Sequence, residues 1–414
     1  MSDTILRTAD GKPLKAALQR ASAVARRRAF WLVLPLLAFV VITFVVPIGQ
    51  MLSRSVTNDA FSANMPQLVA WFEANPEGTE PDEAAFAALA ADLTNAAAER
   101  TIGSVATRIN YDVSGTRSLF TSAGRKAKKL EAPFKESVVA MDPKWGEPIV
   151  WAAMRNASAK LTTSFYQAAM DRKLSAKGVF EKAPEDLQVY LKLFGRTLAL
   201  SAVVTFLCLL LGYPVAHLLA SLPMRKSSLL MILVLLPFWT SLLVRTTSWM
   251  VLLQEQGILN NTLVGLGIIS DENRFALMYN QAGTIIAMTH ILLPFMILPL
   301  YSVMKTIPVS YTRAARSLGA TSWTTFRRIY VPQTVPGIGA GGILVFILAV
   351  GYYITPALVG GATGTLISNQ IAFHMQDSLN WSLAAALAAM LLGAVLALYW
   401  VYDRLVGIDN MKLG

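Results

Sequence analysis

Apolar residues are gathered into six long runs along the chain, and polar residues separate each run from the next. An α-helix rises about 1.5 Å per residue, so about 20 apolar residues cross the hydrocarbon core of a bilayer. Each run reaches this length, whereas a buried strand needs only a few residues. The pattern predicts an all-α membrane protein with six transmembrane helices, at residues 30–51, 197–222, 228–253, 282–304, 336–359 and 382–405.

Basic residues in the short polar segments lie mainly on one predicted side of the membrane. The two ends and the segments after the second and fourth runs carry 16 Lys and Arg, whereas the segments after the third and fifth runs carry one, Arg274. Lys and Arg beside spans stay on the cytoplasmic side, so both termini are expected there. Three arginines precede the first run and no small-residue cleavage motif follows it, which predicts an uncleaved helix over 30–51.

Composition supports a multi-pass membrane protein. The chain is 54% hydrophobic and 15% charged, and its net charge is +11. The long insert between the first two runs holds 16 basic and 17 acidic residues, so the cytoplasmic segments account for the excess. The basicity is an orientation signal and does not favour nucleic-acid binding. The expected organisation is a cytoplasmic segment, the first helix, the insert, a membrane domain of five helices and a cytoplasmic tail, at 1–29, 30–51, 52–190, 191–406 and 407–414.

The insert over 52–190 is expected to be a helical domain outside the cytoplasm. Residues 82–100 are rich in alanine, and Phe86, Leu89, Leu93 and Ala97 recur at helical spacing. Residues 147–171 repeat the pattern with Trp151, Met154, Leu161 and Phe165. Two readings remain open: a helical cap on the outer mouth, which we favour, or a contact surface for a solute-binding protein.

The polar segment over 306–334 has the composition of a loop that another protein approaches closely. Alanines at 314, 315 and 320 keep the backbone accessible, and Gly319 permits a sharp break between two short helices. Thr321 or Ser322 can cap the second helix, and Pro332 suits the first turn of the next one. The candidate docking residues are Arg313, Ala314, Ala315, Gly319, Ala320, Ile329 and Pro332.

The third apolar run contains a proline and a charge. Pro237 removes a hydrogen bond from the helical ladder, and an irregular backbone at membrane depth is tolerated where it lines a cavity or is buried in protein. Arg245 is costly within a span and is expected to point into the protein or a wet cavity, where Glu255 or another subunit pairs with it. Trp239 and Trp249 fit interfacial anchors or a transport path equally well. The candidate path comprises Pro237, Trp239, Thr240, Ser241, Arg245, Tyr352 and Tyr353.

From about Arg196 onward, the chain resembles the permease subunits of spermidine/putrescine ABC importers. The loop carries this resemblance together with Leu-Gly-Tyr-Pro-Val-Ala-His at 211–217 and Leu-Pro-Phe-Trp-Thr-Ser at 236–241. The resemblance implies a type I importer permease fold and polyamine import by ATP-driven alternating access. It implies a second homologous permease, two copies of an ATPase that dock on the loop, and a periplasmic binding protein. The family usually has Glu where this chain has Arg313, and its familiar members have a much shorter segment in place of the insert.

Other chemistry finds little support in the residues. The chain lacks a Gly-x-x-x-x-Gly-Lys-Ser/Thr motif, so it is expected to carry no cofactor, and ATP with Mg²⁺ would bind the partner ATPase. The lone Cys208 and three scattered histidines predict no metal site; His217 and His290 are read as making packing hydrogen bonds. The chain is thus expected to be a transport subunit and not an enzyme. Alternatives are import of another small nitrogen-containing solute, an ion-coupled secondary transporter, which would need ionisable groups in mid-membrane, and a membrane scaffold.

Overall fold

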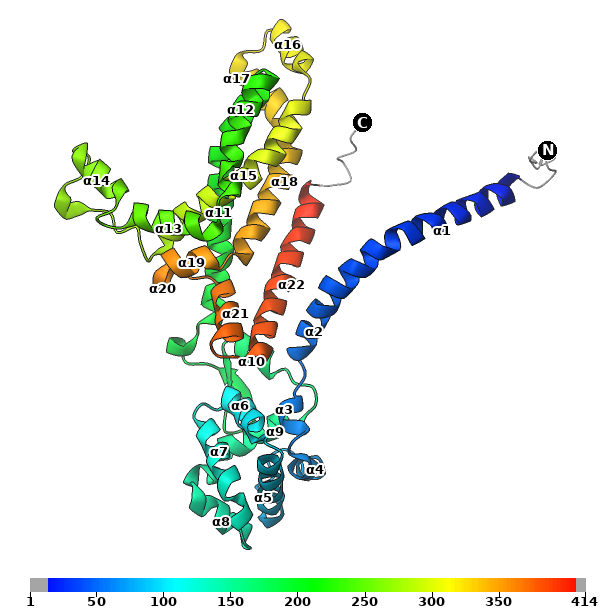
Figure 1. Cartoon of the computed structure of the whole chain (residues 1–414), viewed down its shortest axis with the longest axis vertical. Coiled ribbons are helices and arrows are strands. Elements are labelled where there is room, and N and C mark those ends of the chain that lie inside the picture. The colour runs from blue at the N-terminus through cyan, green and yellow to red at the C-terminus, as the bar shows by residue number, and fades with distance from the viewer. Residues whose placement is uncertain (1–13, 407–414) are drawn as a thin grey trace.

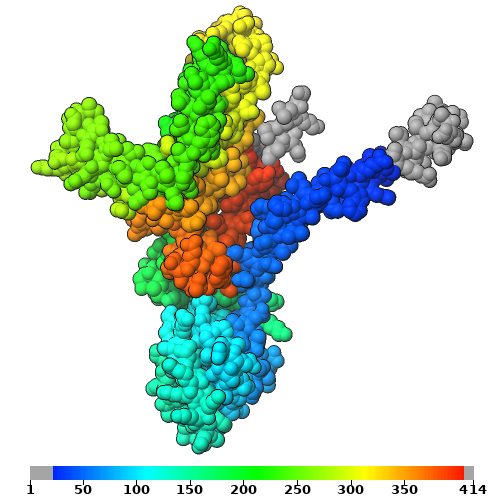
Figure 2. Space-filling model, viewed as in Figure 1, coloured from blue at the N-terminus to red at the C-terminus, as the bar shows by residue number. Residues whose placement is uncertain are grey.

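The computed structural model describes residues 14–406 and has three parts: a long N-terminal helix, a compact insert and a helical membrane domain (Figure 1). The first part contains α1 (Leu14–Val40), a π-helical turn η1 (Val41–Val45) and α2 (Val46–Arg54). Its apolar stretch, Ser22–Arg54, contains no buried residue. Figure 2 shows α1 projecting away from the rest of the chain, whereas α2 contacts α22 (Trp381–Val406). The expected segments 1–29 and 407–414 lie partly or wholly outside the described residues.

The insert forms its own hydrophobic core, as a folded domain would. Its helices are α3 (Asp59–Ser62), α4 (Pro66–Ala74), α5 (Glu83–Ala98), α6 (Ile102–Asp112), α7 (Thr116–Lys126), α8 (Phe134–Met141), α9 (Pro148–Ser158) and α10 (Ser164–Ala169). Fully buried Phe86, Phe120 and Trp145 lie in this core. Edge-on aromatic contacts, such as Phe120 against Trp145 at 4.9 Å between ring centroids, add to the apolar burial.

Two details of the insert differ from the sequence-based expectation. The pattern at 82–100 predicts α5 well, but the pattern at 147–171 spans two helices, because α9 ends at Ser158 and α10 begins at Ser164. Leu161 lies in the break and is exposed, so its place in the predicted helical stripe is wrong. A short antiparallel hairpin of β1 (Arg172–Leu174) and β2 (Phe180–Lys182) then leads to the membrane domain.

Four long helices form the membrane domain: α11 (Tyr190–Ser221), α15 (Gln281–Thr306), α18 (Val331–Gly351) and α22 (Trp381–Val406). Helices α11, α15 and α18 pack on one another around a core that includes Val204, Cys208, Met288 and Met296. Cys208 is buried in this core, as expected of a packing residue. Glycines at 337 and 341 let α18 approach α15 closely, since a Cβ at either position would lie within 3.1 Å of an α15 side chain.

The third predicted span is not a straight helix. Helix α12 (Met224–Leu235) and the 3₁₀ turn η5 (Leu236–Trp239) are followed by α13 (Leu242–Leu253) and α14 (Ile258–Gly265), and the two halves are bent by 95°. The chain therefore has five helices long and apolar enough to span a membrane among the described residues, or six if the bent pair is one span. The α13–α14 arm projects sideways from the domain (Figure 1).

The fifth predicted span, 336–359, is displaced along the chain. Its helical segment runs from Ser322 to Gly351, and Tyr352 then adopts an extended conformation that ends it. Three short helices follow: α19 (Ile354–Val359), α20 (Gly361–Gly364) and α21 (Ile367–Gln376). The insert and the short helices α16 (Val309–Ser317) and α17 (Ser322–Thr325) lie at opposite ends of the molecule, as Figure 1 shows.

Candidate docking loop and translocation path

The first turn of the candidate docking loop follows the end of α16 and depends on a glycine. Helix α16 ends at Ser317, and Gly319 has φ of +87°, a conformation that L-residues with a side chain rarely adopt. The Gly319 amide donates to the Arg316 carbonyl at 3.0 Å, and the Ala320 amide donates to the Ala315 carbonyl at 3.1 Å. These bonds satisfy carbonyls that the helix end leaves unpaired, in the manner of a Schellman motif.

The second half of the loop continues directly into a span. Of the two candidate caps, Thr321 is the one used: its hydroxyl accepts a hydrogen bond from the Thr324 amide at 3.2 Å. Helix α17 then passes through a π-helical turn, η7 (Phe326–Tyr330), into α18, whose first turn contains Pro332 as expected. The loop is thus joined to the membrane domain through continuous helix on this side.

An aromatic cluster packs the π-helical turn against α11. Phe326 stacks on Trp323 and Tyr330, and the His217 ring lies edge-on to Tyr330 with 4.9 Å between centroids. The expectation that His217 makes a packing hydrogen bond is wrong within the described part of the chain, because its Nδ1 is buried without a partner. Tyr213 supplies the polar link instead, through a 3.1 Å hydrogen bond with the Thr334 hydroxyl.

The loop surface is open to a partner. Helix α16 has no buried residue, and Leu318, beside the turn, is 89% exposed. Arg313 and Ala314 are exposed on α16, while Ala315 and Ala320 are half-buried. On the distal side, Pro332 is exposed and Ile329 is half-buried. All seven candidate docking residues therefore lie in the continuous segment from α16 to the first turn of α18, at the end of the domain. The exposed apolar side chain of Leu318 lies at the turn between α16 and α17.

The elbow between η5 and α13 contains four of the candidate path residues. Pro237 lies in the 3₁₀ turn, and its carbonyl accepts a 2.8 Å hydrogen bond from the Thr240 hydroxyl. Ser241 begins α13 and, with Thr240, is exposed. The Trp239 side chain is 80% exposed. The break expected at Pro237 is present, and it turns these side chains outward from the domain.

Arg245 lies one turn into α13, inside a cluster that the sequence did not indicate. Its amide donates to the Ser241 carbonyl at 3.0 Å, and its half-buried guanidinium has an Nε without a partner among the described residues. It lies four residues before Trp249, which places both side chains on one face of α13. The suggested partner Glu255 is exposed and makes no ion pair with Arg245 within the described ranges.

Neighbouring polar groups complete this cluster. Trp249 donates from Nε1 to His290 Nδ1 at 3.1 Å, so His290 does make the packing hydrogen bond that was expected. The fully buried hydroxyls of Thr246 and Thr355 are 3.2 Å apart and join α13 to α19. Spacing in the sequence could not place these residues together, because they come from three helices more than 40 positions apart.

The two path tyrosines lie where α18 ends. The Tyr352 carbonyl accepts from the Ser368 hydroxyl at 2.7 Å, and the Tyr353 carbonyl accepts from the Asn369 side chain at 2.8 Å. Tyr352 is half-buried, whereas Tyr353 is 39% exposed. The structure therefore leaves Trp239 and Tyr353 on the surface and partly covers Tyr352.

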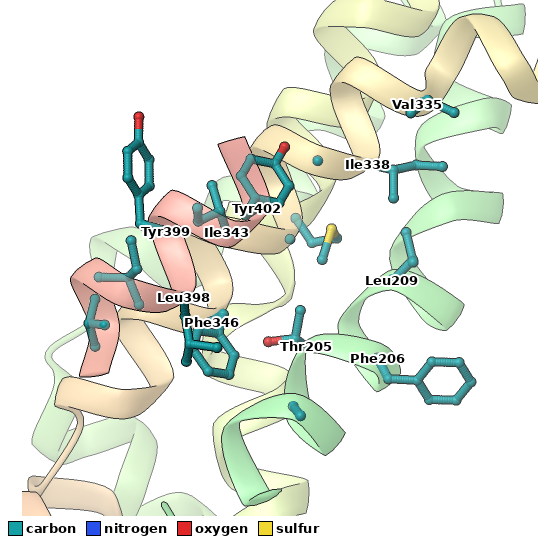
Figure 3. A pocket seen from close by; sticks show the side chains of 16 residues that line it. Thr205, Phe206, Leu209, Val335, Ile338, Ile343, Phe346, Leu398, Tyr399 and Tyr402 are labelled. Atoms are coloured by element: carbon teal, nitrogen blue, oxygen red, sulfur yellow. The ribbon is translucent and has the colours of Figure 1, made fainter. Parts of the chain in front are cut away.

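A large apolar cavity of 490 Å³ lies between α11, α18 and α22 (Figure 3). Its lining includes Phe206, Leu209, Ile338 and Leu398, with hydroxyls from Thr205 and two tyrosines but no charged side chain. The cavity offers a cation no carboxylate, only aromatic rings such as those of Phe346 and Tyr399, so it is a weak candidate for a cation site. Among residues 14–406, no group of three His, Cys, Asp or Glu is placed to hold a metal ion.

The described residues thus have the architecture of an α-helical, multi-pass membrane protein with one broken span and an exposed helical loop. Residues 209–407 match the family described as binding-protein-dependent transport system inner membrane component, and the chain belongs to this family of ABC importer permeases. It is therefore a multi-pass inner-membrane permease with the type I importer permease fold expected for it. The match begins after the insert, which is additional to the family domain.

Two sequence relatives, both PotB proteins, agree with this assignment. The spermidine/putrescine transport system permease protein PotB of Escherichia coli strain K12 is 38% identical over 221 residues, covering 53% of this chain and 80% of that protein. PotB of Salmonella typhimurium strain SL1344 is also 38% identical over 221 residues, with 76% of its length covered. A solved bacterial ABC transporter for import of the acidic polysaccharide alginate is 17% identical with a TM-score of 0.47, covering 71% of this chain and 99% of that one.

Proposed function

We propose that this permease imports a polyamine such as spermidine or putrescine, by alternating access that is driven by ATP hydrolysis on a separate ATPase. The observation that carries the cargo is the 38% identity to spermidine/putrescine permeases over most of their length. The chain itself would perform no catalysis and hold no cofactor. ATP and Mg²⁺ would bind the ATPase.

The loop of α16 and α17 would be the ATPase docking site. An exposed α16, a fixed turn at Gly319 and a solvent-exposed Leu318 support this role. Arg313 is exposed and makes no ion pair within the described residues, so restoring the usual family residue with Arg313→Glu is expected to be tolerated. Two ATPase copies, a second homologous permease and a periplasmic binding protein would complete the importer. In this arrangement the loop and both termini are cytoplasmic and the insert is periplasmic.

The elbow of α12 and α13 would line the path at the contact with the second permease. The exposed indole of Trp239 offers a ring face to a cation. Arg245 is the unfavourable feature for a cationic cargo, because its charge is uncompensated within the described part of this chain. An acidic residue of the second permease would neutralise it. If Arg245 stays unpaired, its positive charge would repel a cation. Import of a different small nitrogen-containing solute is then the favoured alternative.

Uptake by the reconstituted importer tests the cargo. The chain, its partner permease, its ATPase and its binding protein would be placed in proteoliposomes and supplied with labelled putrescine, spermidine or a neutral amino acid. ATP-dependent uptake of the polyamines, and little of the amino acid, is expected. If only the amino acid were taken up, the assignment of a polyamine cargo would be wrong. If uptake continued without ATP, the protein would be an ion-coupled transporter.

Thiol labelling tests the orientation independently. The native Cys208 is buried, which gives a low background. A cysteine at exposed Ser118 in the insert should react with a membrane-impermeant reagent from the periplasmic side, whereas one at exposed Ser317 should react only after the membrane is opened. Labelling of Ser317→Cys from outside would reverse the assigned orientation.

A further inference from the structure

A polar cavity of 650 Å³ lies where the insert meets the membrane domain. Its walls come from the end of α2, from α3, α6 and α10 of the insert, and from the first residues of α22. Figure 1 shows these elements meeting below the membrane helices, at the end opposite α16 and α17. The family match begins at residue 209, so the insert walls lie outside the matched domain.

A buried arginine of the insert lines this cavity with a donor left over. Arg108 is only 3% exposed, and its Nη1 makes a 2.9 Å ion pair with Asp112. Its Nε donates to the Asn58 side chain, and its guanidinium lies 5.0 Å from the Phe165 ring centroid. Nη2 has no hydrogen-bond partner within residues 14–406. The Arg108 charge is thus only partly compensated, and it favours an anionic group in the neighbouring cavity.

Two further charges of opposite sign line the same cavity. Arg54 is exposed at the end of α2, with its guanidinium 6.0 Å from the Trp381 ring centroid. Asp59 is exposed at the start of α3. Neither makes an ion pair among the described residues. Two guanidinium groups and one carboxylate on one wall suit a ligand that carries both an anionic oxygen group and a cation.

The cavity lies at the level of a membrane interface. Arg54 is the last residue of the first apolar helix and Trp381 is the first residue of the last one. Arginine and tryptophan at the ends of spans lie among lipid headgroups, where one end of the side chain is apolar and the other is wet. The charged walls are therefore placed beside the phosphate and ammonium groups of the outer leaflet.

We propose that this cavity binds a phosphoester that carries an ammonium group, as in a phosphatidylethanolamine headgroup or its free glycerophospho form. Arg54 holds the phosphate, the buried Arg108 adds its positive charge behind the cavity wall, and Asp59 receives the ammonium. The bound headgroup fixes the insert against the ends of α2 and α22. This assignment does not depend on the proposed cargo.

Lipid retention by the purified full chain tests the site. Native mass spectrometry would compare chains equilibrated with phosphatidylethanolamine or with phosphatidylglycerol, which lacks the ammonium. We expect preferential retention of phosphatidylethanolamine. Arg54→Gln should reduce retention of both lipids, by at least about threefold for loss of one exposed charge-assisted contact. Asp59→Asn should remove the preference between them. Arg125→Gln, an exposed arginine on α7, is the matched charge control and should change neither.

These variants change exposed side chains, so they avoid the buried Arg108–Asp112 pair, whose disruption would unfold the insert. Unchanged thermal unfolding of the lipid-free variants verifies this. Free glycerophosphoethanolamine distinguishes the source: if it competes at equal concentration, the site takes the soluble phosphoester, and if it does not, the acyl chains contribute and the ligand is the lipid. Equal retention of both lipids, unaffected by Arg54→Gln and without binding of the free headgroup, would overturn the proposal.

Discussion

Gly319 allows a direct test of whether the backbone of the candidate docking loop matters for coupling. Its φ of +87° favours glycine, yet a Cβ added there would meet no atom within 4 Å. A substitution therefore acts through backbone conformation alone until a partner is present. Gly319→Val strains the turn, whereas Gly319→Asn adds a side chain that tolerates this conformation. Gly319→Trp places a large ring on the surface that the ATPase would approach.

The size of the effect follows from the conformational cost. A left-handed residue with a side chain costs about 1–2 kcal/mol, and a branched one lies at the upper end. If the ATPase binds only the observed turn, this free energy is lost from binding. About 1–2 kcal/mol corresponds to a dissociation constant raised roughly 5- to 30-fold for Gly319→Val. Gly319→Asn should cost much less, and Gly319→Trp should abolish docking if the surface is tightly packed.

Gly78 in the insert provides the matched control. It has the same φ of +87° and also has nothing within 4 Å of an added Cβ. Gly78→Val should therefore cost similar local stability while leaving the ATPase site untouched. The assay is ATPase binding and cargo-stimulated ATP hydrolysis by the assembled importer. If Gly319→Val and Gly319→Trp both gave normal stimulated hydrolysis, or if Gly78→Val impaired it equally, the docking assignment would be wrong.

Three other predictions concern the path, the helix packing and the titration of His374. Trp239→Ala should weaken apparent cargo affinity by about 2- to 30-fold with basal ATP hydrolysis unchanged, from a ring–cation contact of about 0.5–2 kcal/mol; an unchanged uptake curve would leave Trp239 as an interfacial anchor. Gly339→Ala should lower the unfolding temperature, because the added Cβ would lie 1.9 Å from the Tyr402 hydroxyl. Adding Tyr402→Phe to this variant removes the hydroxyl and should partly restore the unfolding temperature. Gly342→Ala is the control, since a Cβ at that position meets no atom within 4 Å. Burial lowers the pKa of His374 in the folded chain, so as the pH falls the unfolded chain binds this proton before the folded chain does. The free energy of unfolding should therefore decrease below about pH 6.5, and it should decrease less steeply in His374→Gln. Thermal unfolding measured as a function of pH tests this.

Strong periodic signals made the helical spans predictable. Long apolar runs and the asymmetry of Lys and Arg do not depend on contacts with the rest of the chain. The turn at Gly319 and the cap at Thr321 were predictable for the same reason, since both act within a few residues. The sequence also located the break at Pro237, because a proline without an amide must interrupt the ladder.

Features that depend on distant contacts were not predictable. A proline marks a break but does not set its angle, so the 95° bend was not foreseen. Arg245 and Trp249 are four residues apart on α13, but His290 lies on α15, and no spacing along the chain predicts that it would meet Trp249. Likewise, α9 and α10 were read as one helix because the apolar spacing continues across Leu161, which the fold leaves exposed.

Helix α18 connects the two candidate sites, and its packing indicates how coupling would travel. It is continuous with the loop through η7, and it ends at Gly351, directly before Tyr352 of the candidate path. Its 21 residues span about 30 Å, comparable with the bilayer core. Gly337 and Gly341 hold it close to α15, and Gly339 lies against Tyr402 of α22. A helix packed on two sides moves with its neighbours, so a displacement of the loop would reach Tyr352 by movement of the packed helices together and not by a relay of side-chain changes along α18.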